Sequence, residues 1–318
     1  MWIPTQLGTH GEILKSAGFE LDPKVLTDPT VAPLGAVVSL QGCSASFVSP
    51  DGLVVTNHHC VGGMLQFNST STPDISKNGY HAKTRADEKW AGPTSRIFVT
   101  HSFKDVTTEV RAGLETLPDD LARHDKLEER EKAIVAACEK DRPEWRCTVK
   151  SYFGGAQYLL IEQLEIRDVR LVYVPPESVG DFGGEIDNWR WPRHGGDFAF
   201  IRAYVGKDQK PADHAKSNVP YRPAHYLRVA SKPLAAGDFV VVGGYPGKTN
   251  RLRSAAEVRE SLDWDYPRKI AAYEAGLATL ANIVKENPKL EPKAETKTSG
   301  MSNRLIRTRG LSEGLGKG

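Results

Sequence analysis

The stretch Gly42–Cys60, GCSASFVSPDGLVVTNHHC, constrains the fold of this chain more than any other. Its two short apolar runs, Ala45–Val48 and Leu53–Val55, flank the sequence Ser-Pro-Asp-Gly, which is typical of a turn. The stretch is therefore predicted to form a β-hairpin. A cysteine stands near each end, and two histidines, His58 and His59, precede the second cysteine.

A histidine at the end of a strand is well placed to act as a catalytic base. Its ring must stay within hydrogen-bond reach of a nucleophile, so the backbone beneath it has to be held still. A disulfide at the neighbouring cysteine would do this. The alternative is that His58 and His59 are ordinary loop histidines, because a motif of one or two residues is weak.

The four cysteines fall into two close pairs, Cys43 with Cys60 and Cys138 with Cys147. Such pairs predict two disulfides and an oxidising compartment. Neither pair has the spacing of a zinc site, and the adjacent residues 58–60 cannot all face one ion. The sequence therefore predicts no metal centre.

Composition narrows the class of protein. A chain of 318 residues with 39% hydrophobic and 26% charged residues predicts a soluble globular protein of about two domains. The net charge of +2 favours neither nucleic acid nor a membrane surface as partner, and no apolar run is long enough to span a bilayer. The first ten residues, MWIPTQLGTH, lack the apolar core of a signal peptide. An exported protein would therefore have lost its leader already.

The hairpin and the residues after it resemble a known family. Cys43 together with Thr56-Asn57-His58-His59-Cys60 resembles the segment around the catalytic histidine of chymotrypsin-like serine peptidases. The double histidine before cysteine is similar to the bacterial S46 family of dipeptidyl-peptidases. This resemblance puts His59, not His58, at the catalytic position, and it implies that the cysteine after the histidine pairs with the one at the start of the hairpin.

Further apolar runs predict the remaining strands, and one charged stretch predicts a helix. Residues 119–140 begin with acidic residues after Pro118 and carry Leu127, Ile134 and Cys138 on one face, which indicates a helix. The predicted strands are Ala36–Leu40, Ile97–Thr100, Thr148–Phe153, Tyr158–Ile161, Val169–Val174, Asp197–Val205 and a buried strand Phe239–Val242.

The loop that enters the strand Asp197–Val205 is rich in glycine, tryptophan and aspartate. Long loops of this composition usually carry function. An aspartate just before an apolar strand is where chymotrypsin-like peptidases keep the acid that orients the histidine, so Asp197 is preferred over Asp181 and Asp187. We interpret His194 as support for the loop. The block from Gly183 to Asp197 also resembles S46 sequences.

The same loop carries a predicted binding site for the substrate's free α-amine. In S46 enzymes, residues at the positions that Asn188, Trp189 and Asn303 match bind this amine. An ammonium group has three donors, and an asparagine carbonyl or a tryptophan ring can receive it. The alternatives are that Asn188 caps a turn, that Trp189 and its neighbour Trp191 fill the end of a barrel, and that Asn303 is a surface residue.

The pattern becomes helical after residue 250. Val258 and Leu262 share one face, and a second stripe runs from Ile270 to Val284, with Pro267 dividing the two. The resemblance implies a mainly β protein with a chymotrypsin-like double β-barrel catalytic domain, incomplete here. Residues 1–249 would be its N-terminal part, and residues 250–318 the start of an inserted α-helical domain.

No nucleophile is recognisable in this chain. S46 enzymes carry their serine in a Gly-Asn-Ser-Gly type of motif after the helical domain, and no such motif occurs here. Residues 310–314, GLSEG, match the G-x-S-x-G nucleophile elbow, but no strand precedes them, so we interpret the match as chance. Ser44 and Ser46 are interpreted as structural. The serine is expected beyond this chain.

The resemblance implies a serine dipeptidyl-peptidase that releases dipeptides from the free N-termini of oligopeptides. It also implies a periplasmic or secreted location, no cofactor, and a homodimer for the full-length enzyme. Two rival functions remain from the residues alone. One is a chymotrypsin-like periplasmic endopeptidase, and the other is a non-catalytic binding module with a relict site.

Overall fold

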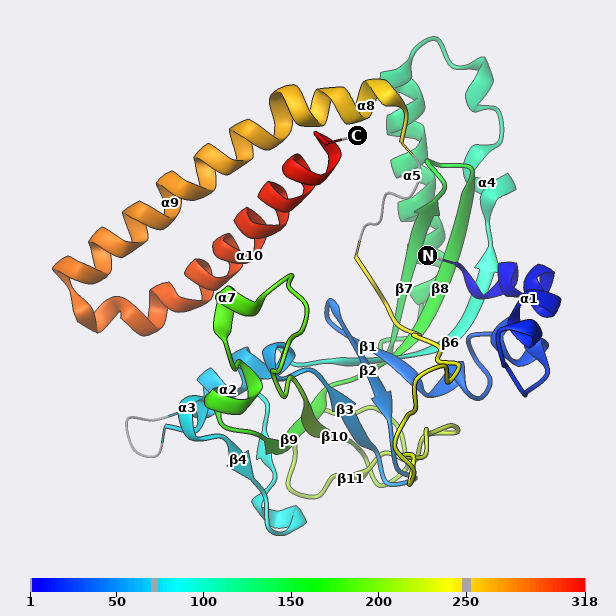
Figure 1. Ribbon diagram of the computed structural model, residues 1–318. Coiled ribbons are helices and arrows are strands. Elements are labelled where there is room, and N and C mark those ends of the chain that lie inside the picture. The colour runs from blue at the N-terminus through cyan, green and yellow to red at the C-terminus, as the bar shows by residue number, and fades with distance from the viewer. Residues whose placement is uncertain (1, 70–73, 248–252, 318) are drawn as a thin grey trace. The chain divides into compact units, whose positions relative to one another are not determined.

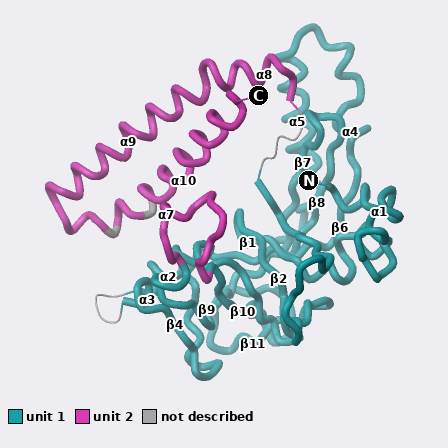
Figure 2. Tube along the Cα trace, viewed as in Figure 1, with its two compact units in different colours: residues 1–180, 197–247 teal, residues 181–196, 248–318 magenta. Residues whose placement is uncertain are grey.

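The structure is a computed structural model that describes residues 2–69, 74–247 and 253–317. The chain forms two compact units (Figure 2). The sheet unit comprises Met1–Gly180 and Asp197–Gly247, and the helical unit comprises Asp181–Gly196 and Lys248–Gly318. The predicted boundary between residues 249 and 250 falls outside the described residues. The loop from Asp181 to Gly196 groups with the C-terminal helices and not with the sheet.

The sheet unit is built on one antiparallel sheet in the order β4-β9-β10-β3-β2-β1-β6-β8-β7, with β11 paired to β10 and β5 paired to β9 (Figure 1). Its strands are β1 Val37–Leu40, β2 Cys43–Phe47, β3 Leu53–Thr56, β4 Tyr80–His81, β5 Lys89–Trp90, β6 Ile97–Asp105, β7 Trp145–Tyr152, β8 Gln157–Ile166, β9 Asp168–Val174, β10 Ala199–Val205 and β11 Val219–Pro220. The fold is thus mainly antiparallel β-sheet with a helical C-terminal region.

The helices of both units are α1 Gly11–Ser16, α2 Gly62–Asn68, α3 Ile75–Asn78, α4 Thr107–Arg111, α5 Asp120–Glu139, α6 Glu177–Gly180, α7 Gly184–Asp187, α8 Ala255–Glu260, α9 Tyr266–Glu286 and α10 Glu291–Leu315. No helix within the described ranges combines the length and the apolar character that crossing a bilayer requires.

The predicted hairpin is present as β2 and β3. Ser46 pairs with Val55 and Phe47 with Val54, and the turn between the strands is the predicted Ser-Pro-Asp-Gly. Alternate residues of these strands are buried, because successive side chains of a strand point to opposite faces of the sheet. Phe47 and Val54 lie in the main core with residues of β1, β9 and β10.

A second core lies between the helices α4 and α5 and the strands β7 and β8 (Figure 1). The Asp119 side chain caps α5 by accepting a hydrogen bond from the Ala122 N–H at 2.8 Å. Ile134 and Cys138 on the predicted apolar face are buried. The predicted disulfide between Cys138 and Cys147 is present and joins α5 to β7.

One charged residue of the sheet is completely buried. Asp168, at the start of β9, accepts hydrogen bonds from Arg170 at 3.0 and 2.7 Å, from His214 Nδ1 at 2.9 Å and from Asn218 at 2.9 Å. A buried charge costs free energy unless it is paired and hydrogen-bonded, and here every neighbour is a donor. In the sheet, Asp168 of β9 lies opposite Tyr204 of β10. The cluster therefore lies at the C-terminal end of β10.

The prediction of a buried strand at Phe239–Val242 is wrong. The segment has no regular secondary structure, and its three valines are exposed. A strand needs a partner for its backbone N–H and C=O groups. Within the described residues no strand pairs with this segment, so an apolar run alone does not make it part of the sheet.

Pro267 does not divide the helical stripe as predicted. Helix α8, a π-helical turn at Ser261–Asp265 and α9 follow one another without a break. A proline ring clashes with the carbonyl of the residue four positions earlier, and the wider π turn directly before Pro267 accommodates it. The GLSEG sequence lies inside α10, so it forms no nucleophile elbow, in agreement with its interpretation as chance.

Candidate active site

Strand pairing positions the candidate acid beside the candidate base. Strand β10 runs antiparallel to β3, with Ala199 opposite Thr56. Asp197 precedes β10 by two residues and therefore continues the ladder opposite the residues that follow β3. His58 begins the short 3-10 helix His58–Val61 at this point.

Asp197 is hydrogen-bonded to both the ring and the backbone of His59. Its Oδ2 lies 2.8 Å from His59 Nδ1, and its Oδ1 accepts the His59 backbone N–H at 3.1 Å. The Asn57 side-chain amide donates to Oδ2 and to the Asp197 backbone carbonyl, both at 3.1 Å. A carboxylate only accepts hydrogen bonds, so Nδ1 of His59 carries the hydrogen in this pair. This tautomer leaves Nε2 with the lone pair that a general base requires.

The electrostatics of the pair keep Asp197 ionised. Burial alone would raise the pKa of Asp197, but the hydrogen bonds from the His59 ring and backbone, together with that from Asn57, outweigh burial and hold the pKa below its usual value. The side chain of Asp197 is 26% exposed, whereas that of His59 is 69% exposed. A reactant can therefore approach the imidazole, while the carboxylate lies largely behind it.

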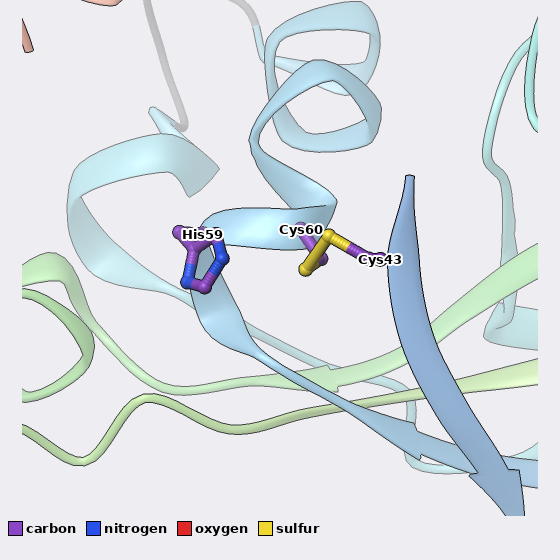
Figure 3. A group of neighbouring side chains, drawn as sticks. All are labelled: Cys43, His59 and Cys60. Carbon is purple, nitrogen blue, oxygen red and sulfur yellow. A yellow bond between two sulfur atoms is a disulfide. The ribbon is translucent and has the colours of Figure 1, made fainter. Parts of the chain in front are cut away.

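The predicted disulfide between Cys43 and Cys60 is present beside His59 (Figure 3). It joins the first residue of β2 to the residue after His59, with a Cα–Cα distance of 6.2 Å. The ligand atoms of Cys43, His59 and Cys60 all lie within 4.8 Å of one another, as they would in a metal site. Both sulfurs are bonded to each other, however, so they offer no thiolate to a metal ion.

The two adjacent histidines have different surroundings. The His58 ring is only 8% exposed, and its Nε2 is buried without a hydrogen-bond partner in the described part of the chain. It packs against Gly180, the last residue of α6. Of the two rings, only His59 is both solvent-exposed and bound to a carboxylate.

The competing aspartates are found in other surroundings. Asp187, at the end of α7, folds its carboxylate over Gly183, where a Cβ would lie only 2.1 Å from Oδ2. Asp181 is exposed. His194, which the sequence assigned to support of the loop, is exposed as well. Trp189 and Trp191 do not fill a barrel end, since they are 59% and 94% exposed.

The residues predicted to bind the substrate amine come together within the helical unit. Asn303, on α10, accepts hydrogen bonds at its Oδ1 from the indole Nε1 of Trp189 at 2.6 Å and from the amide of Asn188 at 3.1 Å. Trp189 has a backbone φ of +60°, a conformation that a bulky residue rarely adopts. Such strained residues cluster at functional sites, and the hydrogen bond to Asn303 helps to hold this one.

Three participants were missed by sequence reasoning. Asn57 binds Asp197, and its position directly before the double histidine was the available signal. Glu185 and Arg193 contact Asn188 from either side, at 2.9 and 3.0 Å. Their spacings of three and five residues from Asn188 fit a compact loop, but a sequence does not reveal which of many charged loop residues turn inward.

The hydroxyl of Ser44 is used by the backbone. Ser44 Oγ accepts the N–H of Tyr245 at 2.7 Å, and so ties the glycine-rich turn at residues 243–247 to β2. Its interpretation as a structural residue is confirmed by this contact.

The family model of peptidase S46 matches residues 1–318. The chain belongs to the peptidase S46 family. An Asp/Glu-specific dipeptidyl-peptidase of Shewanella putrefaciens is 42% identical to it over 99% of this chain and 42% of that protein. A protein of Capnocytophaga gingivalis named dipeptidyl-peptidase 7 is 33% identical over 88% of this chain and 39% of its own length.

Solved structures of one similar protein show the same fold. The crystal structure of Porphyromonas endodontalis DPP11 in complex with the dipeptide Arg-Glu matches with a TM-score of 0.89 and 32% identity, over 98% of this chain and 46% of that one. An alternate conformation of the same protein matches with a TM-score of 0.76 over the whole of this chain. The S46 chain described here thus spans less than half the length of the relatives that it matches.

Proposed function

We propose that this chain is the part of a serine dipeptidyl-peptidase that carries the catalytic base and the acid that orients it. The observation that carries the proposal is the 2.8 Å contact between His59 Nδ1 and Asp197 Oδ2, in a chain that matches the S46 family along its whole length. The names of the relatives, Asp/Glu-specific dipeptidyl-peptidase and dipeptidyl-peptidase 7, support the reaction type.

In the proposed mechanism, His59 Nε2 takes the proton of a serine hydroxyl as its oxygen attacks the carbonyl carbon of the scissile peptide bond. The imidazolium then gives that proton to the leaving amine, and the C–N bond breaks to form an acyl-enzyme. Water, activated by the same histidine, hydrolyses the ester. Asp197 holds the imidazole tautomer and stabilises the imidazolium. The serine and its oxyanion hole belong to the remainder of the full-length enzyme, and the reaction uses only side chains and backbone.

The substrates are proposed to be oligopeptides with a free N-terminus. An enzyme that removes dipeptides needs a group that recognises the terminal ammonium, in addition to its catalytic residues. The cluster of Asn188, Trp189 and Asn303 supports this, because it gathers polar groups on a strained, exposed loop. The relative with 42% identity is named Asp/Glu-specific, so peptides with Asp or Glu as the second residue are the first to test.

The wider assembly is also proposed from the family. We propose a chymotrypsin-like double β-barrel as the complete catalytic domain, with residues 1–249 as its N-terminal part and residues 250–318 as the start of an inserted helical domain. The full-length enzyme is proposed to be a homodimer in the periplasm or outside the cell. The two disulfides support an oxidising compartment.

The test compares a free-amine peptide with its N-acetylated form, using the full-length enzyme. A dipeptidyl-peptidase should release a dipeptide from the first and leave the second intact. Cleavage of both peptides would favour the rival endopeptidase. Cleavage of neither would favour a binding module with a relict site. Asn188→Ala should lower kcat/KM for the free-amine peptide, and an unchanged kcat/KM would remove Asn188 from the proposed anchor.

A further inference from the structure

The amide of Asn188 is held between a cation and an anion in the helical unit. Its Nδ2 donates to Glu185 Oε2 at 2.9 Å, and its Oδ1 accepts from Arg193 Nη1 at 3.0 Å. A guanidinium only donates and a carboxylate only accepts, so these two partners fix which end of the amide is oxygen. Nδ2 also donates to Asn303 Oδ1 at 3.1 Å.

The supply of hydrogen-bond acceptors limits what this cluster can bind. A carbonyl oxygen has two lone pairs, and Oδ1 of Asn303 already accepts from Trp189 and Asn188. The Asn188 oxygen has one lone pair left beside Arg193. An α-ammonium group brings three donors and no acceptor. Among the side chains of this cluster, the acceptors that remain for it are this one lone pair and the carboxylate of Glu185.

Charge singles out Glu185 among these acceptors. Amide oxygens are neutral, whereas an ammonium is bound most strongly by an ionised partner. Glu185 is half-buried, and across the described ranges its carboxylate forms no ion pair within 4.0 Å. Arg193 is directed to the Asn188 oxygen instead. Glu185 is therefore a carboxylate that is hydrogen-bonded to the proposed amine anchor and makes no salt bridge within the described ranges.

The local backbone explains why Glu185 and no other acid of the loop reaches Asn188. Helix α7 begins at Gly184, and residues three apart on a helical turn share a face, which brings Glu185 beside Asn188. Asp187 points to the other side and lies over Gly183. Asp181 is exposed, and its side chain makes no hydrogen bond within the part of the chain that the structure describes.

We propose that Glu185 supplies the negative charge that binds the α-ammonium of the substrate, with Asn188 as its neutral partner. This inference rests on the proposed dipeptidyl-peptidase function. It assigns the charge selectivity of the site to one carboxylate and gives Asn303 the task of holding Trp189 and Asn188 in place.

The test uses the full-length enzyme and two substrates, a free-amine dipeptidyl substrate and its des-amino analogue, in which hydrogen replaces the amine. The readout is the ratio of the two kcat/KM values. Glu185→Gln keeps the shape and an acceptor for Asn188 but removes the charge, and hydrogen bonds to charged groups are worth about 1.5–3 kcal/mol, so the ratio should fall roughly 10- to 100-fold. Glu185→Asp should restore part of it.

Asp181→Asn is the matched control, because it removes the same charge from the same loop without touching Asn188. Its ratio should equal that of the wild type. A fall of equal size in Asp181→Asn and Glu185→Gln would overturn the proposal, since the effect would then come from the general charge of the loop. An unchanged ratio in Glu185→Gln would also overturn it.

The outcomes separate this inference from the proposed function. If Asn188→Ala lowers the ratio and Glu185→Gln does not, the exopeptidase assignment stands and the role of Glu185 is refuted. If the wild type cleaves both substrates equally well, the exopeptidase assignment itself fails. A pH profile adds a second readout. The α-amine of a peptide has a pKa near 8, so wild-type kcat/KM should fall above that pH as the amine loses its charge. In Glu185→Gln this alkaline decline should be weaker, and an identical decline would contradict the proposal.

Discussion

The substitution Gly180→Ala tests how tightly the segment of the proposed catalytic histidine is packed. A Cβ at residue 180 would lie 2.3 Å from His58 Cδ2, 2.4 Å from its Cγ and 2.7 Å from its Nδ1. Non-bonded carbon atoms are comfortable at about 3.5–4.0 Å, so the ring or the backbone must move by roughly 1 Å. Rotation of the ring about the Cβ–Cγ bond leaves Cγ in place and so does not relieve the clash, and His58 is buried, which limits larger movements of the side chain.

Two effects of Gly180→Ala are expected from this displacement. Overpacking of a close-packed site costs about 1–3 kcal/mol, so the free energy of unfolding of the 318-residue chain should fall by that amount. His58 is bonded directly to His59, and a misplacement of about 1 Å in a catalytic group can cost roughly 100-fold. In the full-length enzyme, kcat for a free-amine peptide should therefore fall between 10- and 100-fold.

The assays are urea denaturation of the chain and steady-state peptide hydrolysis by the full-length enzyme. Gly63→Ala is the control, because Gly63 lies in α2 and a Cβ there meets no atom within 4 Å. It should be neutral or stabilise by about 0.5–1 kcal/mol. A Gly180→Ala variant with wild-type unfolding free energy would refute the reasoning. So would an equal cost of Gly180→Ala in a His58→Ala background, where the clashing ring is absent.

Three further predictions concern the buried charge of Asp168, the disulfide between Cys43 and Cys60, and the nucleophile that is expected outside this chain. Asp168→Asn should destabilise the chain by about 3–5 kcal/mol at pH 7, because the buried Arg170 would lose the carboxylate that it is paired with. Burial would raise the pKa of Asp168, but the hydrogen bonds of its neighbours outweigh burial and lower it, so its stabilisation is present above about pH 4 and is lost as the pH falls further. The difference in unfolding free energy between the wild type and Asp168→Asn, measured by urea denaturation, should thus be smaller at acidic pH than at pH 7. An equal difference at acidic pH and at pH 7 would contradict this. Replacing Cys43 and Cys60 by serine should cost about 3 kcal/mol for a sequence separation of 17, measured in the same way, and a cost near zero would count against it. The 318-residue chain alone should not hydrolyse peptides, and turnover that His59→Ala abolishes would show that a nucleophile within the chain had been overlooked.

The approach of Asp197 to His59 followed from sequence because it depends on strands. A hairpin with a strong turn signal fixes where β3 ends, and an aspartate directly before an apolar strand lies at a strand end as well. Antiparallel pairing of β3 with β10 then brings the two ends together. Local patterns thus predicted the elements, the family resemblance supplied the roles of His59 and Asp197, and the pairing of β3 with β10 came from the structure.

The surroundings of Asn188 could not be predicted in the same way. Glu185 and Arg193 lie in an irregular loop, where no periodicity tells which side chains converge. The cluster also includes the left-handed backbone at Trp189 and a hydrogen bond to Asn303, which lies more than 100 residues further along the chain. A sequence motif marks such a loop as functional but gives neither its hydrogen bonds nor its charge balance.

The error at Phe239–Val242 has a different origin. The apolar run fits a strand, and the glycines after it fit a turn, so every local signal was present. A strand is stable only when another strand satisfies its backbone, and this depends on residues elsewhere in the protein. An apolar run shows that a segment is compatible with a β-strand. Whether the segment forms a strand depends on whether another strand pairs with it.

The most direct test of the proposed function is the effect of His59→Ala on kcat/KM of the full-length enzyme with a free-amine peptide. Removal of a triad histidine, or of the carboxylate that orients it, typically costs about four to six orders of magnitude. We predict that His59→Ala falls into this range with an unchanged fold by circular dichroism, and that Asp197→Asn loses about 10⁴-fold. A correctly folded His59→Ala enzyme that kept more than a tenth of the wild-type kcat/KM would contradict the assignment of His59 as the catalytic base.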